Sequence, residues 1–297
     1  MSRKHPVIAV TGSSGAGTTT VKRTFEQIFR REGVEAAVLE GDSFHSMTRA
    51  EFNAAVEHAD KNKLLMPSHF GPEANHFDKI EETFRVYAET GMCQRRYYIH
   101  SIAEAATINA RLGTKLLPGE FTPWENIPEG SDILFYEGLH GGVVTDEVNI
   151  AQHVDLLIGV VPIVNLEWIQ KIHRDTAERG YSAEAVTQTI LRRMRDYVGY
   201  ICPQFSNTDI NFQRVSTVDT SNPFVARDVP TADESFVVIH FRESSKIKVN
   251  FEYLLAMIKD SFMSRRNTIV APGGKMSFAM ELILSPLIRE ILENRKG

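Results

Sequence analysis

The first forty residues constrain the fold most strongly, because a short apolar run leads into a glycine-rich loop. Residues 7–11 are apolar and stand before Gly12, which predicts a buried strand. The apolar side chains of residues 18–32 are spaced as on one face of a helix, and Gly33 follows as a C-cap. Residues 36–40 predict a second strand. The order strand, loop, helix, strand predicts a βαβ unit and therefore favours a parallel sheet.

The glycine-rich loop has the spacing of a phosphate-binding loop but lacks its lysine. Thr18 stands where the pattern G-x4-G-K-[ST] places lysine. Glycines let backbone N–H groups converge on a phosphate, and the helix N-terminus beyond adds partial positive charge. Thr19 holds the position whose hydroxyl usually binds Mg2+. The alternative is a glycine-rich turn without a ligand. We predict that ATP is bound by Gly12, Ser13, Ser14, Gly15, Ala16, Gly17, Thr18, Thr19 and Thr20.

Apolar runs and helical patterns alternate along the rest of the chain. Residues 101–131 carry several prolines and glycines and are expected to form an irregular insertion. Further strands are predicted at residues 95–100, 133–136, 156–161 and 236–241. Helices are predicted at residues 49–61, 77–90, 164–179, 183–200, 251–262 and 275–294.

Composition narrows the class of protein. The chain has 297 residues, 42% of them hydrophobic, which is ample for a real core. With no repeat or low-complexity linker, we expect one α/β domain over residues 1–297, with residues 164–200 as a candidate lid. A net charge of −5 gives nucleic acid no basic face. Cys93 and Cys202 are far apart and predict reduced thiols. Without a signal peptide or an apolar run that could span a bilayer, we expect a soluble, cytoplasmic protein and no membrane partner.

Carboxylates follow two of the predicted strands. Glu137 ends the run at residues 133–137, where phosphate-loop enzymes place an acidic residue near the metal. The alternative is a surface carboxylate at a strand end. Asp42 follows the strand at residues 36–40, and the carboxyl ends of parallel strands line the ligand crevice. We predict that Glu137 binds Mg2+ and that Asp42 faces the nucleotide phosphates.

The residues after Asp42 suit an anionic, hydroxylated substrate. His45 and Arg49 follow at +3 and +7 and would share a face with Asp42 on a helix. A carboxylate can take the hydroxyl proton, while the cations hold a remote phosphate. The alternative is an exposed helix start capped by Asp42. Tyr98 and His100 share one face of the strand predicted there, a pairing that is more often structural.

The helix predicted at residues 164–179 carries a group of charges. Lys171, Arg174 and Asp175 lie on neighbouring positions of one helix face, and Arg179 lies near its end. The alternative is a solvated charged face. Because the phosphate loop lacks its lysine and phosphoryl transfer needs cationic help, Lys171 is a candidate replacement.

Five stretches together resemble the phosphoribulokinase family, in its shorter proteobacterial form, over nearly the whole chain. These stretches are VTGSSGAGT at residues 10–18, EGDSFH at 40–45, FYEGLH at 135–140, VNLEWIQKIHRD at 164–175 and TDINFQR at 208–214. The resemblance implies a P-loop kinase with a mixed, mostly parallel sheet flanked by helices, like nucleoside monophosphate kinases. It also implies transfer of the ATP γ-phosphoryl group to O1 of ribulose 5-phosphate, with Mg2+, in the Calvin cycle. A threonine at position 18 is typical of this family.

The resemblance assigns roles to individual residues. By similarity, Asp42 is the general base, Lys171 acts on the transferring phosphoryl group, and Asp175 is a further acidic participant. Thr19 and Glu137 serve the metal. The residues that bind the sugar phosphate by similarity are His45, Arg49, Tyr98, His100, Arg174 and Arg179.

The resemblance also implies an octamer that NADH activates and AMP inhibits. Arg31 and Arg265 match the effector site of the family, whereas His240 replaces an arginine of some relatives, which weakens the expectation of NADH control. Asn53 likewise stands where some relatives carry a lysine near the sugar phosphate. Two alternatives remain at this point: a kinase of the same architecture for uridine or pantothenate, and an ATP-binding regulatory protein. A neutral nucleoside would leave Arg49, Arg174 and Arg179 without a phosphate to hold.

Overall fold

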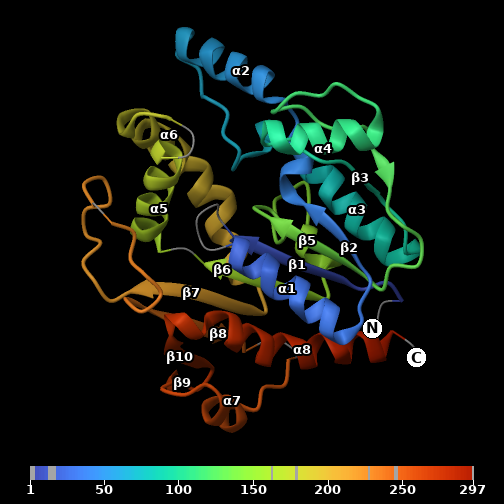
Figure 1. Ribbon diagram of the computed structural model, residues 1–297, viewed down its shortest axis with the longest axis vertical. Helices are drawn as coiled ribbons and strands as arrows, with labels where there is room; N and C mark the ends of the chain where they lie inside the picture. Colours follow the sequence, from blue (N-terminus) through green and yellow to red (C-terminus); the bar gives the residue numbers. More distant parts are fainter. Residues whose placement is uncertain are drawn as a thin grey trace.

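A computed structural model describes residues 4–12, 18–161, 163–177, 180–226, 228–243 and 247–295; the side chains of residues 18–20 are not described. One sheet has the strand order β2-β5-β1-β6-β7-β8-β10-β9 (Figure 1). The strands from β2 to β7 run parallel, and β8, β10 and β9 continue the sheet antiparallel. Their bounds are β1 Val7–Gly12, β2 Ala36–Glu40, β5 Ile133–Gly138, β6 Leu156–Val161, β7 Ile210–Ser216, β8 Ser235–Phe241, β9 Phe262–Arg265 and β10 Thr268–Pro272.

Helices cover both faces of this sheet. On one face, α1 (Thr18–Glu32) and α8 (Met276–Asn294) pack against each other and against inward side chains such as Ile8 and Phe135. On the other face, α3 (Phe77–Thr90) covers the side chains that alternate with them. This arrangement buries β1 on both sides, as its continuous apolar run predicts. The mixed, mostly parallel sheet flanked by helices is thus confirmed.

The remaining elements gather around the ends of the strands (Figure 1). A small ribbon of β3 and β4 lies beside α4. The helices α5 and α6 pack on each other, and a π-helical turn at Tyr197–Ile201 follows α6. The bounds are α2 Arg49–Lys61, α4 Ile102–Leu112, α5 Val164–Ala177, α6 Ala183–Asp196, α7 Phe251–Met257, β3 Gln94–Arg95 and β4 Glu125–Asn126.

Four predicted elements differ in the structure. The strand predicted at residues 95–100 is reduced to β3 and a single bridge between Tyr98 and Phe121, because these residues pair only with a short local segment. The insertion predicted at residues 101–131 contains α4, which Ser101 caps and Gly113 ends in the left-handed conformation.

The helix predicted at residues 251–262 stops at Met257, since Asp260 has φ 65° and the chain then enters β9. The helix predicted at residues 183–200 changes to π-helical geometry at Tyr197.

Within the described ranges, every helix is too short or too polar to cross a lipid bilayer.

Candidate active site

The carboxyl ends of β1, β2 and β5 meet at one edge of the sheet. Glu40 of β2 and Val10 of β1 both stand opposite Glu137 of β5. The chain then passes through Gly41 and Gly138, which touch so closely that a Cβ on Gly41 would lie 2.8 Å from the Cα of Gly138. Because β1 pairs with β5 on one side and β6 on the other, this edge is where a doubly wound sheet forms its crevice.

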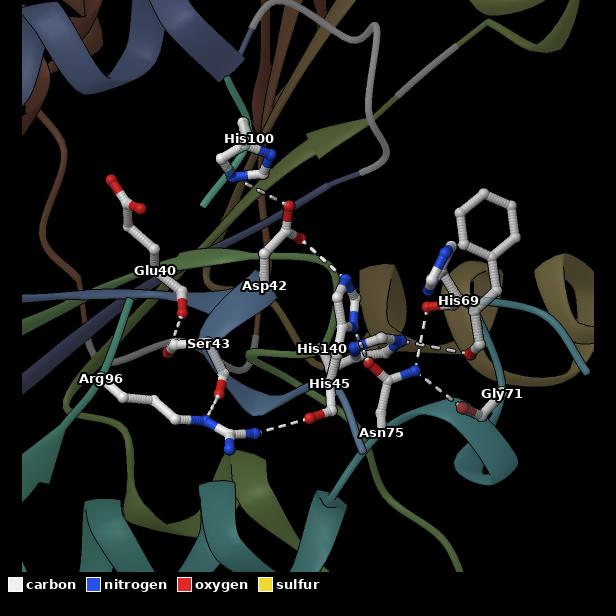
Figure 2. A network of polar contacts seen from close by, with 11 residues as sticks. Glu40, Asp42, Ser43, His45, His69, Gly71, Asn75, Arg96, His100 and His140 are labelled. Carbon is white, nitrogen blue, oxygen red and sulfur yellow. Dashed lines mark hydrogen bonds and ion pairs between the residues drawn. The ribbon is translucent and has the colours of Figure 1, made fainter. Parts of the chain in front are cut away.

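Asp42 projects into this region from a 3-10 turn that directly follows β2. Its carboxylate lies 3.4 Å from Nε2 of His45 and 3.6 Å from Nε2 of His100 (Figure 2). Partial desolvation favours the neutral acid, but the hydrogen bond with His45 and the electrostatic effect of the neighbouring His45 and His100 side chains outweigh it and hold the pKa of Asp42 well below its usual range. Asp42 is therefore a carboxylate, and 41% of its side chain is open to solvent, so a substrate can reach it.

The structure brings four other predicted residues to Asp42. The Tyr98 ring lies 5.8 Å from the ring of His45 and 5.0 Å from that of His100. The Arg49 guanidinium lies 5.9 Å from the Tyr98 ring, and its Nη2 donates to the carbonyl oxygen of His100 at 3.4 Å. These five residues come from three separate segments and form one polar group, although they do not share a single helix face.

Arg49 is held by the turn that contains Gly119. The N–H of Arg49 donates to the carbonyl oxygen of Gly119 at 2.9 Å. Gly119 has φ 98°, and a Cβ there would lie 2.5 Å from the Cβ of Arg49. Only glycine meets both conditions, so this turn fixes where α2 begins.

Arg96 supports the same segment from the other side and is not among the residues predicted from sequence. It donates from Nε to the carbonyl oxygen of Ser43 and from Nη2 to that of His45, each at 2.7 Å (Figure 2). Its guanidinium also lies 3.8 Å from the ring centre of Phe121 and 4.7 Å from that of Trp124. Burial lowers the pKa of Arg96. The Arg96 side chain fixes the turn that presents Asp42 and His45. In the sequence, the one signal for such a role is that Arg96 stands two residues before Tyr98.

A second group of residues missed from the sequence lies behind His45. Asn75 accepts at its Oδ1 from His45, and the His69 ring lies 4.6 Å from that of His45 (Figure 2). His140 is buried and contacts the carbonyl oxygen of Phe70 through Nε2 at 3.2 Å. Burial lowers the pKa of His69 to about 2 and that of His140 to about 3, so both rings are neutral at physiological pH.

Glu137 carries a charge that its surroundings disfavour. Burial and the nearby Asp42 raise the pKa of Glu137 to about 7, although Lys22 opposes this. Lys22, from α1, forms an ion pair with Glu40 at 2.6 Å. A bound divalent cation would favour the ionised carboxylate, so the site fits a metal with one direct protein carboxylate.

Within the described ranges, no three or more His, Cys, Asp or Glu side chains gather as a preformed metal site.

The charged residues of α5 form their own cluster. Lys171 contacts Asp175, and Nε of Arg174 lies 3.0 Å from the other carboxylate oxygen. Burial and the charge of Arg193 lower the pKa of Lys171 to about 8, against the opposing effect of Asp175. Arg193 also lowers the pKa of His69, whose ring lies 4.6 Å from that of His45, so its charge acts on both groups. Lys171 and Asp175 are buried, which argues against a simple solvated charged face.

Several predicted site residues fall outside this description. Ser13, Ser14, Gly15, Ala16, Gly17 and Arg179 lie outside the described residues, as do the side chains of Thr18, Thr19 and Thr20. Gly12 is described, and a Cβ there would lie 2.6 Å from the carbonyl oxygen of Val160, so β1 and β6 require glycine at the start of the loop.

The three predicted effector residues occupy two places. His240 of β8 and Arg265 of β9 both stand opposite Thr268 of β10, and Nδ1 of His240 lies 3.0 Å from the Thr268 hydroxyl. Arg31 of α1 instead pairs with Glu281 of α8 at 2.8 Å.

Fold and site together define a class of protein: a kinase with a glycine-rich phosphate loop after β1 and a carboxylate at each of two neighbouring strand ends. The comparisons agree with this class. The model of the phosphoribulokinase / uridine kinase family matches residues 7–221. The chain therefore belongs to the phosphoribulokinase / uridine kinase family. Membership implies ATP as the phosphoryl donor and Mg2+ as its counter-ion.

The similar proteins cover the whole chain. The chromosomal phosphoribulokinase of Cupriavidus necator is 60% identical over 296 residues, covering 100% of this chain and 99% of that protein. Phosphoribulokinase of Nitrobacter vulgaris is 60% identical with the same coverage of both chains. The solved structure of phosphoribulokinase from Rhodobacter spheroides superposes with a TM-score of 0.88 at 54% identity and covers 99% of both chains.

Proposed function

We propose that the chain transfers the γ-phosphoryl group of ATP to O1 of ribulose 5-phosphate, forming the ribulose 1,5-bisphosphate of the Calvin cycle. The observation that carries this proposal is the arrangement at the end of β2. There Asp42 is held as a carboxylate beside His45 and His100, with Arg49 close by. The 60% identity to phosphoribulokinases along the whole chain supports the choice of substrate.

In this proposal Asp42 accepts the proton of the attacking hydroxyl. A carboxylate within hydrogen-bond reach of a sugar hydroxyl can act as general base as the oxygen attacks. The pKa of Asp42 lies well below its usual range, so the carboxylate is ready at physiological pH. Once the proton has been taken, the oxygen attacks the γ-phosphorus in line with the leaving oxygen.

The remaining residues bind the two anions. The sugar phosphate is proposed to lie against Arg49, Tyr98 and His100, with Arg174 and Arg179 closing over it from the lid segment at residues 164–200. His45 contributes to substrate binding through its contact with Asp42. Lys171, assisted by Asp175, neutralises charge on the transferring group. In this proposal, closure of the lid segment moves Lys171 from its ion pair with Asp175 to the transferring group.

The nucleotide is assigned to the loop from Gly12 to Thr20. Backbone N–H groups would hold the phosphates, and Thr19 and Glu137 would hold Mg2+, which shields phosphate charge when bound. The raised pKa of Glu137 supports a cation there. Lys22, paired with Glu40 near Glu137, is a further cation beside the site of the absent loop lysine.

The proposal extends to assembly and control. As the resemblance implies, we propose a cytoplasmic homo-oligomer, an octamer, of a single-domain chain. NADH activation would require Arg31, His240 and Arg265 to meet one ligand. The opposed positions of His240 and Arg265 around Thr268 support half of such a site.

A turnover assay tests the substrate assignment. The purified chain is given ATP and Mg2+ with ribulose 5-phosphate, other phosphorylated sugars, uridine and pantothenate, and 31P NMR identifies each product. We expect ribulose 1,5-bisphosphate as the main product. Phosphorylation of uridine or pantothenate alone would contradict the proposal and leave the arginines near the site without an anion to bind.

A further inference from the structure

A buried chain of polar contacts leads inward from Asp42. The His45 ring lies between two partners: Nε2 faces Asp42 at 3.4 Å, and Nδ1 lies 2.7 Å from Oδ1 of Asn75 (Figure 2). His45 and Asn75 are also joined as an isolated β-bridge, and both are buried. The ring therefore has little freedom to turn or to exchange partners.

The orientation of the Asn75 amide follows from its other contacts. Nδ2 donates to the carbonyl oxygens of His69 at 3.0 Å and Gly71 at 2.7 Å. A carbonyl oxygen can only accept, so the NH2 group must face these two, and Oδ1 must face His45. Oδ1 in turn can only accept, which requires Nδ1 of His45 to carry a hydrogen.

Because Nδ1 carries a hydrogen, the neutral and charged forms of the His45 ring differ only at Nε2. When the ring is neutral, Nε2 has a lone pair and faces the carboxylate of Asp42 as a second acceptor. When the ring is charged, Nε2–H donates to that carboxylate. Two acceptors at 3.4 Å are suited to sharing one proton between them.

Asp42 and His45 are the two groups of this cluster that can exchange a proton, because the other groups around the His45 ring do not compete for it. The rings of His69 and His140 are neutral, because burial holds their pKa near 2 and 3. Tyr98 meets the ring edge to face, and Arg96 binds the backbone oxygen of His45 rather than its ring. The titratable and charged side chains facing this cluster from neighbouring elements are those of Asp42, Arg96, His100 and Arg193.

We propose that Asn75 is a positioning residue for catalysis: it fixes His45 as the Nδ1–H tautomer, so that Nε2 can receive the proton that Asp42 collects. This step rests on the proposed function, in which Asp42 takes the hydroxyl proton. The O–H bond of the sugar breaks, and the proton reaches a carboxylate oxygen of Asp42. It then passes to Nε2, which gives imidazolium His45 and returns Asp42 to its ionised form. No further reactant is needed.

The tautomer can be measured without any variant. Two-dimensional 15N NMR of the full chain with labelled histidine distinguishes Nδ1–H from Nε2–H in a neutral ring, and a His45→Gln sample assigns the signal. We expect the Nδ1–H form for His45. The Nε2–H form in the wild-type chain would overturn the proposal.

Two variants separate the positioning role from a purely structural one. Asn75→Ala removes both the acceptor and the donors, and we expect kcat to fall on the order of 10- to 100-fold, as when an orienting partner of a functional histidine is lost, with the KM for ATP unchanged. Asn75→Asp keeps an oxygen at Nδ1 but loses the donors to His69 and Gly71. We expect Asn75→Asp to keep the hydrogen on Nδ1. Its carboxylate also favours the imidazolium form of His45 and faces the carbonyl oxygens of His69 and Gly71, so kcat should stay reduced at neutral pH.

Ser46→Ala is the matched control. The Ser46 hydroxyl donates to the carbonyl oxygen of Glu73 at 2.9 Å, so it ties the same two segments without touching the ring. We expect unchanged kcat and an unchanged His45 signal. If Asn75→Ala leaves the His45 signal in the Nδ1–H form, or if Ser46→Ala lowers kcat as much as Asn75→Ala does, the role is structural and the proposal is overturned. Failure of the wild-type chain to phosphorylate any sugar phosphate would instead contradict the proposed function. The NMR experiment would still report the tautomer of His45, because it does not depend on turnover.

Discussion

Replacing Glu137 by glutamine should stabilise the ligand-free protein and abolish its use of Mg2+. Burial and the charge of Asp42 raise the pKa of Glu137 from 4.5 to about 7. The folded state therefore binds this proton more tightly than the unfolded chain does. It follows that the stability this group provides is fully present below pH 4.5 and is lost as pH rises through about 7.

The size of the effect follows from the pKa difference. With about 1.4 kcal/mol per pKa unit, ionised Glu137 costs roughly 3 kcal/mol of folding free energy near pH 8, but only about 1.5 kcal/mol near pH 5.5. Glutamine has no charge to desolvate at either pH. Glu137→Gln should therefore be more stable than wild type by a margin that grows by roughly 1.5–2 kcal/mol between these pH values, about 3 °C in melting temperature for a chain of this size.

Urea or thermal unfolding in EDTA without nucleotide measures this margin. Glu89→Gln is a suitable control, because Glu89 is exposed on α3 and pairs with Arg85 at 3.1 Å, a partner that stays charged at both pH values. The same Glu137→Gln variant should lose most Mg2+-dependent turnover, so stability and activity change in opposite directions. A stability margin that stays constant between the two pH values would refute the idea that Glu137 carries a disfavoured charge.

Two further substitutions test the neighbouring clusters. If protonated Lys171 assists transfer, kcat should fall as pH rises through about 8, and Arg193→Met should move this fall to higher pH because it removes a cation that lowers the Lys171 pKa; a pH–rate profile without such a shift would contradict the role. Arg96→Met breaks two charged hydrogen bonds and should cost about 2–3 kcal/mol in unfolding free energy and lower kcat/KM, measured by denaturation and steady-state kinetics. Arg95→Met, which loses a contact with Glu125 and a cation–π contact with Tyr97 but no hydrogen bond to the Ser43–His45 turn, is its control, and equal losses in both variants would argue against an anchoring role for Arg96.

The fold was predictable where local signals and hydrophobic pattern agree. The helix α1 has the predicted bounds, and Gly33 follows it with φ 66°. In contrast, no strand was predicted at β7, although its residues alternate between polar and apolar, and pairing with both β6 and β8 makes it a strand. The helix α4 was not predicted, because the prolines and glycines that follow it indicated an irregular segment. Ser101, which caps the helix, was the local signal for its start. Pairing with neighbouring strands therefore determines β7, and a single N-cap determines where α4 begins.

The site was predictable in part for the same reason. Asp42 and Glu137 follow apolar strands, and the geometry of parallel sheets brings such ends together. No spacing in the sequence indicates that Asn75 binds His45 across 30 residues or that Arg96 reaches Ser43 across 53. Those contacts depend on how the loops fold over the sheet. Sequence patterns therefore identify groups that face a substrate more readily than groups that support them.

The most direct test of the account is the turnover of Asp42→Ala with ribulose 5-phosphate, measured together with ATP affinity by calorimetry. We expect kcat to fall on the order of 10²- to 10⁴-fold, as expected when a general base is removed, with an unchanged Kd for ATP. Asp60→Ala, at an exposed carboxylate near the end of α2, should behave as wild type. An Asp42→Ala enzyme that keeps most of its turnover would show that the hydroxyl proton leaves by another route.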